Sequence, residues 1–135
     1  MSTLRREAMS EYTPDRWCVI RIPGDKETIY KVFASWSGSY TGGDSWKLNS
    51  GITQAVLLDC VWEFEGTSGS VYRCRPNSYG ANAYGRAVLD DLITRTYEGT
   101  GIDIEILDEH TNWASLDYDP LQQWIRQGHD LTQKD

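Results

Sequence analysis

The chain has 135 residues, of which 39% are hydrophobic, and its 20 acidic and 13 basic residues give a formal net charge of −7. A chain of this length suits one domain with one hydrophobic core. No segment approaches the roughly 18 apolar residues of a membrane span, and the N-terminus lacks the apolar core of a signal peptide, so we expect a cytosolic protein.

The negative charge is concentrated at the C-terminal end. Residues 101–135 contain eight acidic side chains and two basic ones, Arg126 and Lys134, whereas the first 100 residues contain 12 and 11. A one-signed region repels nucleic acid and anionic membranes. It attracts basic surfaces, including the grooves in which other proteins hold nucleic acid.

The three cysteines do not form a recognisable framework. Cys18, Cys60 and Cys74 are odd in number and widely spaced, with no CxxC pair and no histidine nearby in sequence. This spacing argues against a disulfide framework and against a zinc site. We expect three buried, reduced thiols that pack as small hydrophobic side chains.

The first 75 residues are predicted to be a flexible tail followed by an antiparallel β-meander. Residues 1–13 are polar and without a period, which is typical of a tail. From Asp15 the residues alternate between two faces that are both largely apolar, which predicts a first strand. The Pro23-Gly24-Asp25 turn leads into a second strand over 28–36. Further strands are predicted around 45–53, within the apolar run 54–64, and over 70–75. The short connections favour antiparallel neighbours in a meander over 15–75.

After Pro76 the apolar period becomes that of a helix. The predicted helix covers residues 82–97, with Asn82 as N-cap and Gly99 and Gly101 as the stop. Its apolar residues fall on one stripe, which consists of Tyr84, Val88, Leu89, Leu92, Ile93 and Tyr97.

Residues 101–127 are predicted to form an acidic strand and a short helix. Isoleucines at 102, 104 and 106 alternate with Asp103, Glu105 and Leu107, which suits a strand at the edge of a sheet. Asp119-Pro120 would begin the short C-terminal helix. We therefore expect one α+β domain over 1–135: a twisted antiparallel sheet of about five to six strands with one long helix packed on it and a short C-terminal helix.

Motifs for catalysis are weak. Asp108, Glu109 and His110 are candidates for acid–base chemistry, but they lie in an expected turn, where a solvated acidic face is the simpler interpretation. Ser68-Gly69-Ser70 lacks the following helix of a nucleophile elbow, and Gly42-Gly43-Asp44 lacks the glycine spacing of a phosphate loop. We predict no catalytic residue, no cofactor and no metal site.

The aromatic residues exceed what a small core readily encloses, since the chain has six tryptophans and eight tyrosines. Trp17, Trp36, Trp46 and Trp62 lie on predicted strands and are core candidates. Trp113 lies in a polar segment, where it either caps the core or anchors a protein partner. We expect it to be at least partly exposed in the free protein.

Two segments carry a resemblance. KVFASWSGSYTGGDSWKLNSGI (31–52) and GTSGSVYRCRPNSYG (66–80) resemble stretches of small uncharacterised proteins of bacteriophages and prophages, over roughly a third of the chain. The resemblance attaches no catalytic role to these motifs. It implies a phage origin more than an activity. In that setting a small acidic protein without enzyme signatures looks like an inhibitor of host defence, of which anti-CRISPR proteins and acidic anti-restriction proteins are examples.

Charge and resemblance together predict a non-enzymatic inhibitor in the bacterial cytoplasm. It would mimic nucleic acid and bind a basic surface of a host nucleic-acid-handling defence complex, with a CRISPR effector as the first candidate, and would bind neither nucleic acid nor membrane. The alternatives are a small phage enzyme using Asp108, Glu109 and His110, or a phage structural or assembly protein. The predicted partner-binding residues are Asp103, Glu105, Asp108, Glu109, Trp113, Asp117 and Asp119.

Overall fold

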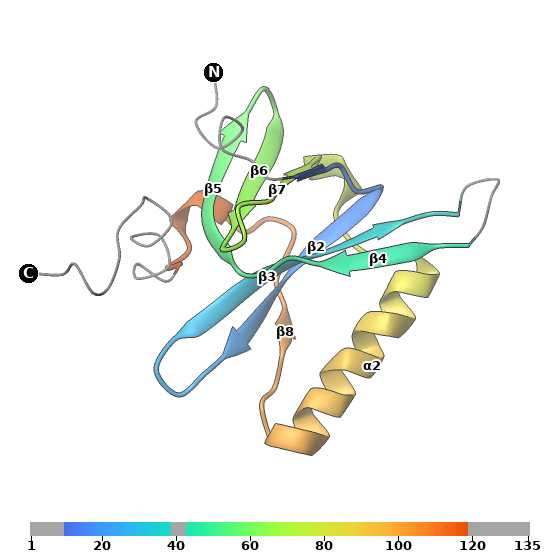
Figure 1. Cartoon of the computed structure of the whole chain (residues 1–135), viewed down its shortest axis with the longest axis vertical. Coiled ribbons are helices and arrows are strands. Elements are labelled where there is room, and N and C mark those ends of the chain that lie inside the picture. The colour runs from blue at the N-terminus through green and yellow to red at the C-terminus, as the bar shows by residue number, and fades with distance from the viewer. Residues whose placement is uncertain (1–9, 39–42, 119–135) are drawn as a thin grey trace, which may run out of the picture.

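Two four-stranded β-sheets and one long helix make up the computed structural model, which describes residues 10–38 and 43–118 (Figure 1). The first sheet has the strand order β1-β7-β6-β5 and the second β4-β3-β2-β8. The α+β class is confirmed, whereas the single sheet that we predicted is wrong.

The strands are short and most of them pair with a neighbour in sequence. They are β1 (Glu11–Tyr12), β2 (Arg16–Pro23), β3 (Thr28–Trp36), β4 (Ser45–Leu48), β5 (Ile52–Leu58), β6 (Val61–Gly66), β7 (Val71–Cys74) and β8 (Glu105–Ile106). The helix α2 covers Ala83–Thr100, and two 3-10 turns, η1 (Pro76–Ser78) and η2 (Trp113–Ser115), lie before and after it.

The two apolar faces of β2 explain the layered arrangement. Trp17 and Val19 join a core between the two sheets, which also contains Phe64 of β6. Cys18 and Ile20, on the opposite face, join a second core with Leu89 of α2. The second sheet is therefore the middle layer, with the first sheet on one side and the helix on the other (Figure 1).

The predicted meander over 15–75 is divided between the two sheets. The predicted hairpin through Pro23 is confirmed, with Pro23 opposite Thr28. The predicted strand over 45–53 is instead β4 in one sheet and the start of β5 in the other, joined by a link over Asn49–Gly51. Gly51 has φ 129°, a backbone conformation that favours glycine. This link is where the chain passes from the middle layer to the outer sheet.

The apolar run over 54–64 is not one strand but the β5–β6 hairpin. Leu58 pairs with Val61, so Asp59 and Cys60 alone form the loop, with φ of 52° and 65°. Two successive left-handed residues are typical of the hairpin turn that matches strand twist. Cys60 is therefore exposed, which corrects the prediction of three buried thiols, whereas Cys18 and Cys74 are buried.

Part of the predicted N-terminal tail is a strand. Glu11 and Tyr12 pair in parallel with Val71 and Tyr72 of β7. Short connections exclude parallel pairing only between strands that follow each other closely, and these two strands lie about 60 residues apart in sequence. The prediction for residues 1–9 lies outside the described residues.

The helix is longer than predicted. Asn82 is the N-cap, as expected, and its Oδ1 accepts a hydrogen bond of 2.6 Å from the Gly85 amide. The stop is Gly101, with φ 78°, whereas Gly99, which we predicted as part of the stop, lies within α2. Of the predicted stripe, Leu89 is buried and Val88, Leu92 and Ile93 pack in the second core. Tyr84 and Tyr97 are 42% and 57% exposed, so the buried part of the stripe is shorter than predicted.

The acidic strand lies where the sequence predicts it. β8 pairs antiparallel with β2 at one edge of the second sheet, with Ile104 buried and Asp103 and Glu105 exposed. The ladder is limited to two residues. The predicted C-terminal helix lies outside the described residues. None of the helices over 10–38 and 43–118 is long and apolar enough to cross a lipid bilayer.

Candidate functional site

The acidic surface consists of Asp103, Glu105, Asp108, Glu109 and Asp117, all of them exposed. Asp103 lies just before β8 and Glu105 within it, and the other three lie in the segment that runs from β8 through η2 to residue 117. The structure therefore presents five of the predicted partner-binding residues to solvent. Asp119, the sixth predicted carboxylate, lies outside the described residues.

Little positive charge offsets this surface. Arg21 lies opposite Glu105 in the β2–β8 pair, and their side chains approach to 3.5 Å. Both side chains are well exposed to water, which weakens such a pair. Glu109 lies 4.0 Å from the His110 ring. Within the described ranges no other arginine or lysine contacts these carboxylates, so the surface keeps most of its negative charge.

Asp108, Glu109 and His110 form an exposed turn. Asp108 Oδ1 accepts a hydrogen bond of 2.7 Å from the His110 amide, and its carbonyl accepts one of 2.6 Å from Thr111 Oγ1. The His110 side chain is 85% exposed. Asp108 therefore shapes the turn. An acid–base pair works best in a cleft that excludes water, and neither cavity described below includes these three residues.

Trp113 is only 1% exposed, so the expectation of partial exposure is wrong. Its ring stacks on Tyr79 at 5.7 Å between centroids and meets Trp17 edge-on at 5.6 Å. Its carbonyl accepts a hydrogen bond of 2.6 Å from Tyr118. The polar neighbours of Trp113 suggested an exposed segment. One of them, Asn112, instead caps the η2 turn that points the indole inward. Trp113 closes the inter-sheet core.

The four other predicted core tryptophans divide into three kinds. Trp17 is buried, as predicted, and donates from Nε1 to the Arg75 carbonyl at 2.6 Å. Trp36 and Trp62 are partly buried against the inter-sheet core. Trp46, on the edge strand β4, is 42% exposed and stacks on Phe33 at 5.5 Å, so its assignment to the core is wrong.

Sequence reasoning missed the residue that holds the acidic segment in place. The Tyr79 hydroxyl donates to the Leu107 carbonyl at 2.6 Å and accepts from the Val19 amide at 3.1 Å. The Leu107 amide donates to the Val19 carbonyl at 2.9 Å. Burial raises the pKa of Tyr79 well above its ordinary value, so its hydroxyl remains a donor. Because Tyr79 lies in an aperiodic stretch, no pattern identified it.

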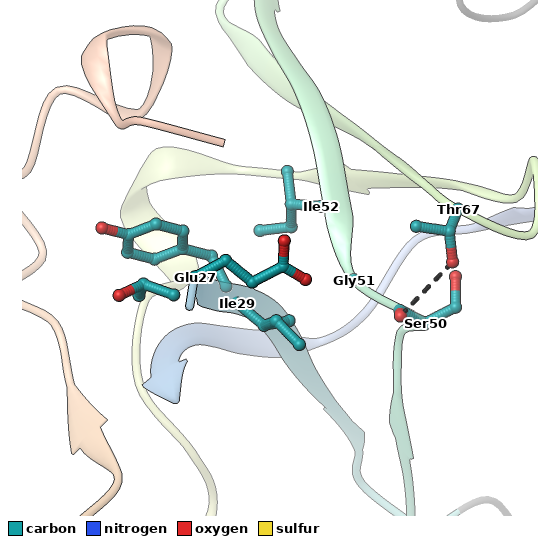
Figure 2. A pocket seen from close by; sticks show the side chains of 8 residues that line it. Glu27, Ile29, Ser50, Gly51, Ile52 and Thr67 are labelled. Atoms are coloured by element: carbon teal, nitrogen blue, oxygen red, sulfur yellow. Dashed lines mark hydrogen bonds between the residues drawn. The ribbon is translucent and has the colours of Figure 1, made fainter. Parts of the chain in front are cut away.

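Two cavities flank the link over Asn49–Gly51, and Ser50 contributes to both. The first, of about 110 Å³, lies between the β2–β3 hairpin and the link. Figure 2 shows Glu27 and Ile29 facing Gly51 and Ile52 across it, with Thr67 donating to the Ser50 carbonyl at 3.4 Å. The second, of about 260 Å³, has a polar lining that includes Lys47, Asn49 and Ser50.

The described residues offer no ready-made metal site, since no three histidine, cysteine, aspartate or glutamate side chains among them lie close enough together to hold an ion.

Comparison with known proteins found no matching family model, no matching curated protein and no matching solved structure.

Proposed function

We propose that the protein is a non-enzymatic binding protein whose acidic surface engages a basic surface on a nucleic-acid-handling partner. The observation that supports this most directly is the exposure of five carboxylates within residues 103–117, with Arg21 as the one arginine in contact among residues 10–38 and 43–118. These carboxylates would occupy lysines and arginines that otherwise contact phosphates. Such charge complementarity selects the partner and speeds the encounter.

The rigidity of the segment supports this role. β8 is hydrogen-bonded to β2, the Asp108 turn is closed by its own hydrogen bonds, and Tyr79 joins Leu107 to the middle sheet. Charges that are already ordered lose less conformational entropy on binding than charges on a mobile tail. Trp113 would contribute from within, because its packing supports this segment, and would not touch the partner.

The resemblance to phage proteins favours a particular partner. A small acidic phage protein that binds a nucleic-acid-handling complex in the host cytoplasm would block host defence. A CRISPR effector is the first candidate, because its guide and target strands lie in positively charged channels. In this proposal the acidic surface replaces nucleic acid on the channel wall.

A charge-matched pair of variants tests the proposal. The test variant carries Asp103→Asn, Glu105→Gln, Asp108→Asn and Glu109→Gln, and the control carries Asp25→Asn, Asp59→Asn, Asp91→Asn and Glu98→Gln. Both lose four negative charges from exposed positions, but only the first loses them from the acidic surface.

Each form is used to capture proteins from a bacterial host lysate, and captured complexes are then assayed for nucleic-acid binding. We expect the wild type and the control to retain a nucleic-acid-binding complex and to displace DNA or RNA from it, and the test variant to retain and displace much less. Equal capture and displacement by both variants would reject the acidic surface as the binding site.

A further inference from the structure

The polar cavity, which we define as the second cavity beside the link, has an unusual charge composition for this protein. It lies between β1, the end of β4, the link and the β6–β7 turn. Its lining includes Tyr12, Lys47, Asn49 and three serines, at 50, 68 and 70. In a chain with a net charge of −7, the lining contains one base and no acid. Such a lining favours a negatively charged ligand.

Asn49 provides a buried donor at this cavity. The residue is 3% exposed, and its Oδ1 accepts hydrogen bonds from the Val32 amide at 2.9 Å and the Gly51 amide at 3.3 Å. Because both partners are backbone donors, the side-chain amide can have only this orientation. Its Nδ2 is buried with no acceptor among the described residues. A buried donor without an acceptor destabilises the fold and is rare, so it calls for an explanation.

Gly66 lies closely packed against that nitrogen. A Cβ on Gly66 would lie 3.0 Å from Asn49 Nδ2 and 2.8 Å from Ser50 Oγ. The backbone does not demand glycine here, since Gly66 is not among the residues with positive φ. Glycine is needed because of this close approach, since any side chain would displace the Asn49 amide and the Ser50 hydroxyl.

Further donors surround the opening. Ser50 Oγ accepts from the Ser68 amide at 3.0 Å, which leaves its own proton to donate. Lys47 Nζ lies 5.2 Å from the centre of the Tyr12 ring, a cation–π contact that holds the ammonium group beside the cavity. Burial raises the pKa of the lining residue Tyr72 to about 12, so its hydroxyl stays neutral.

We propose that the polar cavity binds an oxyanion, the carboxylate or phosphate group of a small molecule, with the Ser50 hydroxyl as the inner donor and Lys47 as the outer cation. The unpartnered Asn49 Nδ2 is buried close to Ser50 and adds partial positive charge to the site. The site is separate from the acidic surface: the cavity lies at the β4 edge of the second sheet and the acidic surface at the β8 edge. The two proposals can therefore fail independently.

Nuclear magnetic resonance titration of the full chain tests the site. Sodium phosphate and sodium acetate are added separately, up to about 50 mM, which resolves millimolar affinities, and sodium chloride at matched ionic strength is the control. We expect a saturable shift of the Asn49 side-chain amide and of the Ser68 backbone amide with at least one oxyanion. The anion that binds more tightly identifies a phosphate or a carboxylate ligand. Saturation with neither anion would overturn the proposal.

Variants separate this site from general charge effects. Lys47→Gln should weaken binding about tenfold, as expected for a charge-assisted hydrogen bond, whereas Lys26→Gln, which lies in the β2–β3 turn, should leave it unchanged. Gly66→Ala should weaken binding by displacing Ser50 Oγ, which the new Cβ would approach to 2.8 Å. Asn49→Asp replaces the amide by a carboxylate, whose negative charge should also weaken binding. If either cavity variant fails to fold, Lys47→Gln and Lys26→Gln still test the site. Equal affinity of these two variants for the anion would refute it.

Discussion

Tyr79 and Leu107 are joined by a hydrogen bond of 2.6 Å from the tyrosine hydroxyl to the leucine carbonyl. The two residues lie 28 positions apart and on either side of α2, so this one contact ties the acidic segment back to the body of the fold. The same hydroxyl accepts from Val19 of β2. The strand β8 is short and forms only a limited ladder with β2. The Tyr79 side chain therefore supplies additional hydrogen bonds that hold the segment in place.

Replacing Tyr79 by Phe should lower the free energy of unfolding by about 1–3 kcal/mol. The Val19 amide and the Leu107 carbonyl would each lose a partner in a partly buried site, which is the costly way to remove a hydrogen bond. Urea denaturation measures the change. Tyr84→Phe, at an exposed position of α2, should change stability by no more than about 0.5 kcal/mol. Equal effects would contradict the role of Tyr79.

Trp113→Ala should cost about 3–5 kcal/mol of stability, the range for a large aromatic side chain removed from a core. Affinity for the partner, measured per folded molecule, should fall only slightly, because Trp113 supports the acidic segment from within and does not touch the partner. Trp46→Ala is the matched control, because this side chain is 42% exposed and should cost much less. A small loss of stability with a large loss of affinity would restore the interface role of Trp113.

Neutralising Asp103, Glu105, Asp108 and Glu109 should slow association with the captured partner and leave the melting temperature nearly unchanged. Exposed charges act across water and steer the encounter. Raising the salt concentration from 0.1 M to 1 M should slow the wild type in the same way, since the Debye length falls from about 10 Å to about 3 Å. Stopped-flow kinetics measure both effects, and unaltered rates at low salt would exclude steering by this surface.

Stability should fall as the pH rises above about 9 to 10. Burial raises the pKa of Tyr72 to about 12, raises that of Cys18 to about 12, and raises those of Tyr79 and Tyr118 still further. These groups lose their protons at lower pH in the unfolded chain, near 8.5 for cysteine and about 10 for tyrosine, so the native state binds more protons in this window. The stabilisation is complete below the unfolded pKa values and is lost up to about pH 12. Urea denaturation between pH 7 and pH 11 should show the decline, and a flat profile would contradict it.

One of the three thiols should react quickly with a thiol reagent in the native protein. Cys60 is exposed in the β5–β6 turn, whereas Cys18 and Cys74 are buried and burial raises the pKa of both. Reaction requires an accessible thiolate. Cys60→Ser should abolish the fast phase, and denaturant should release the two remaining thiols. A fast phase of more than one thiol per chain would show that a buried cysteine is accessible.

Local patterns determined several elements from the sequence. Apolar residues on both faces of an alternating segment predicted β2, and Pro23-Gly24-Asp25 predicted its turn. Asn82 predicted the start of α2, whereas of the predicted stop at Gly99 and Gly101 only Gly101 was correct. The acidic edge strand followed from isoleucines that alternate with carboxylates. These features are readable because the residues that produce each of them are neighbours along the chain.

Tertiary structure decided the rest. The parallel pairing of Tyr12 with β7, the inward orientation of Trp113 and the tie between Tyr79 and Leu107 join segments far apart in sequence. The polar cavity depends on Asn49 and Gly66 meeting where the chain passes from one sheet to the other. The local pattern of apolar residues does not predict which apolar face of one element packs on which face of another. Burial and hydrogen bonding are satisfied only once the layers assemble.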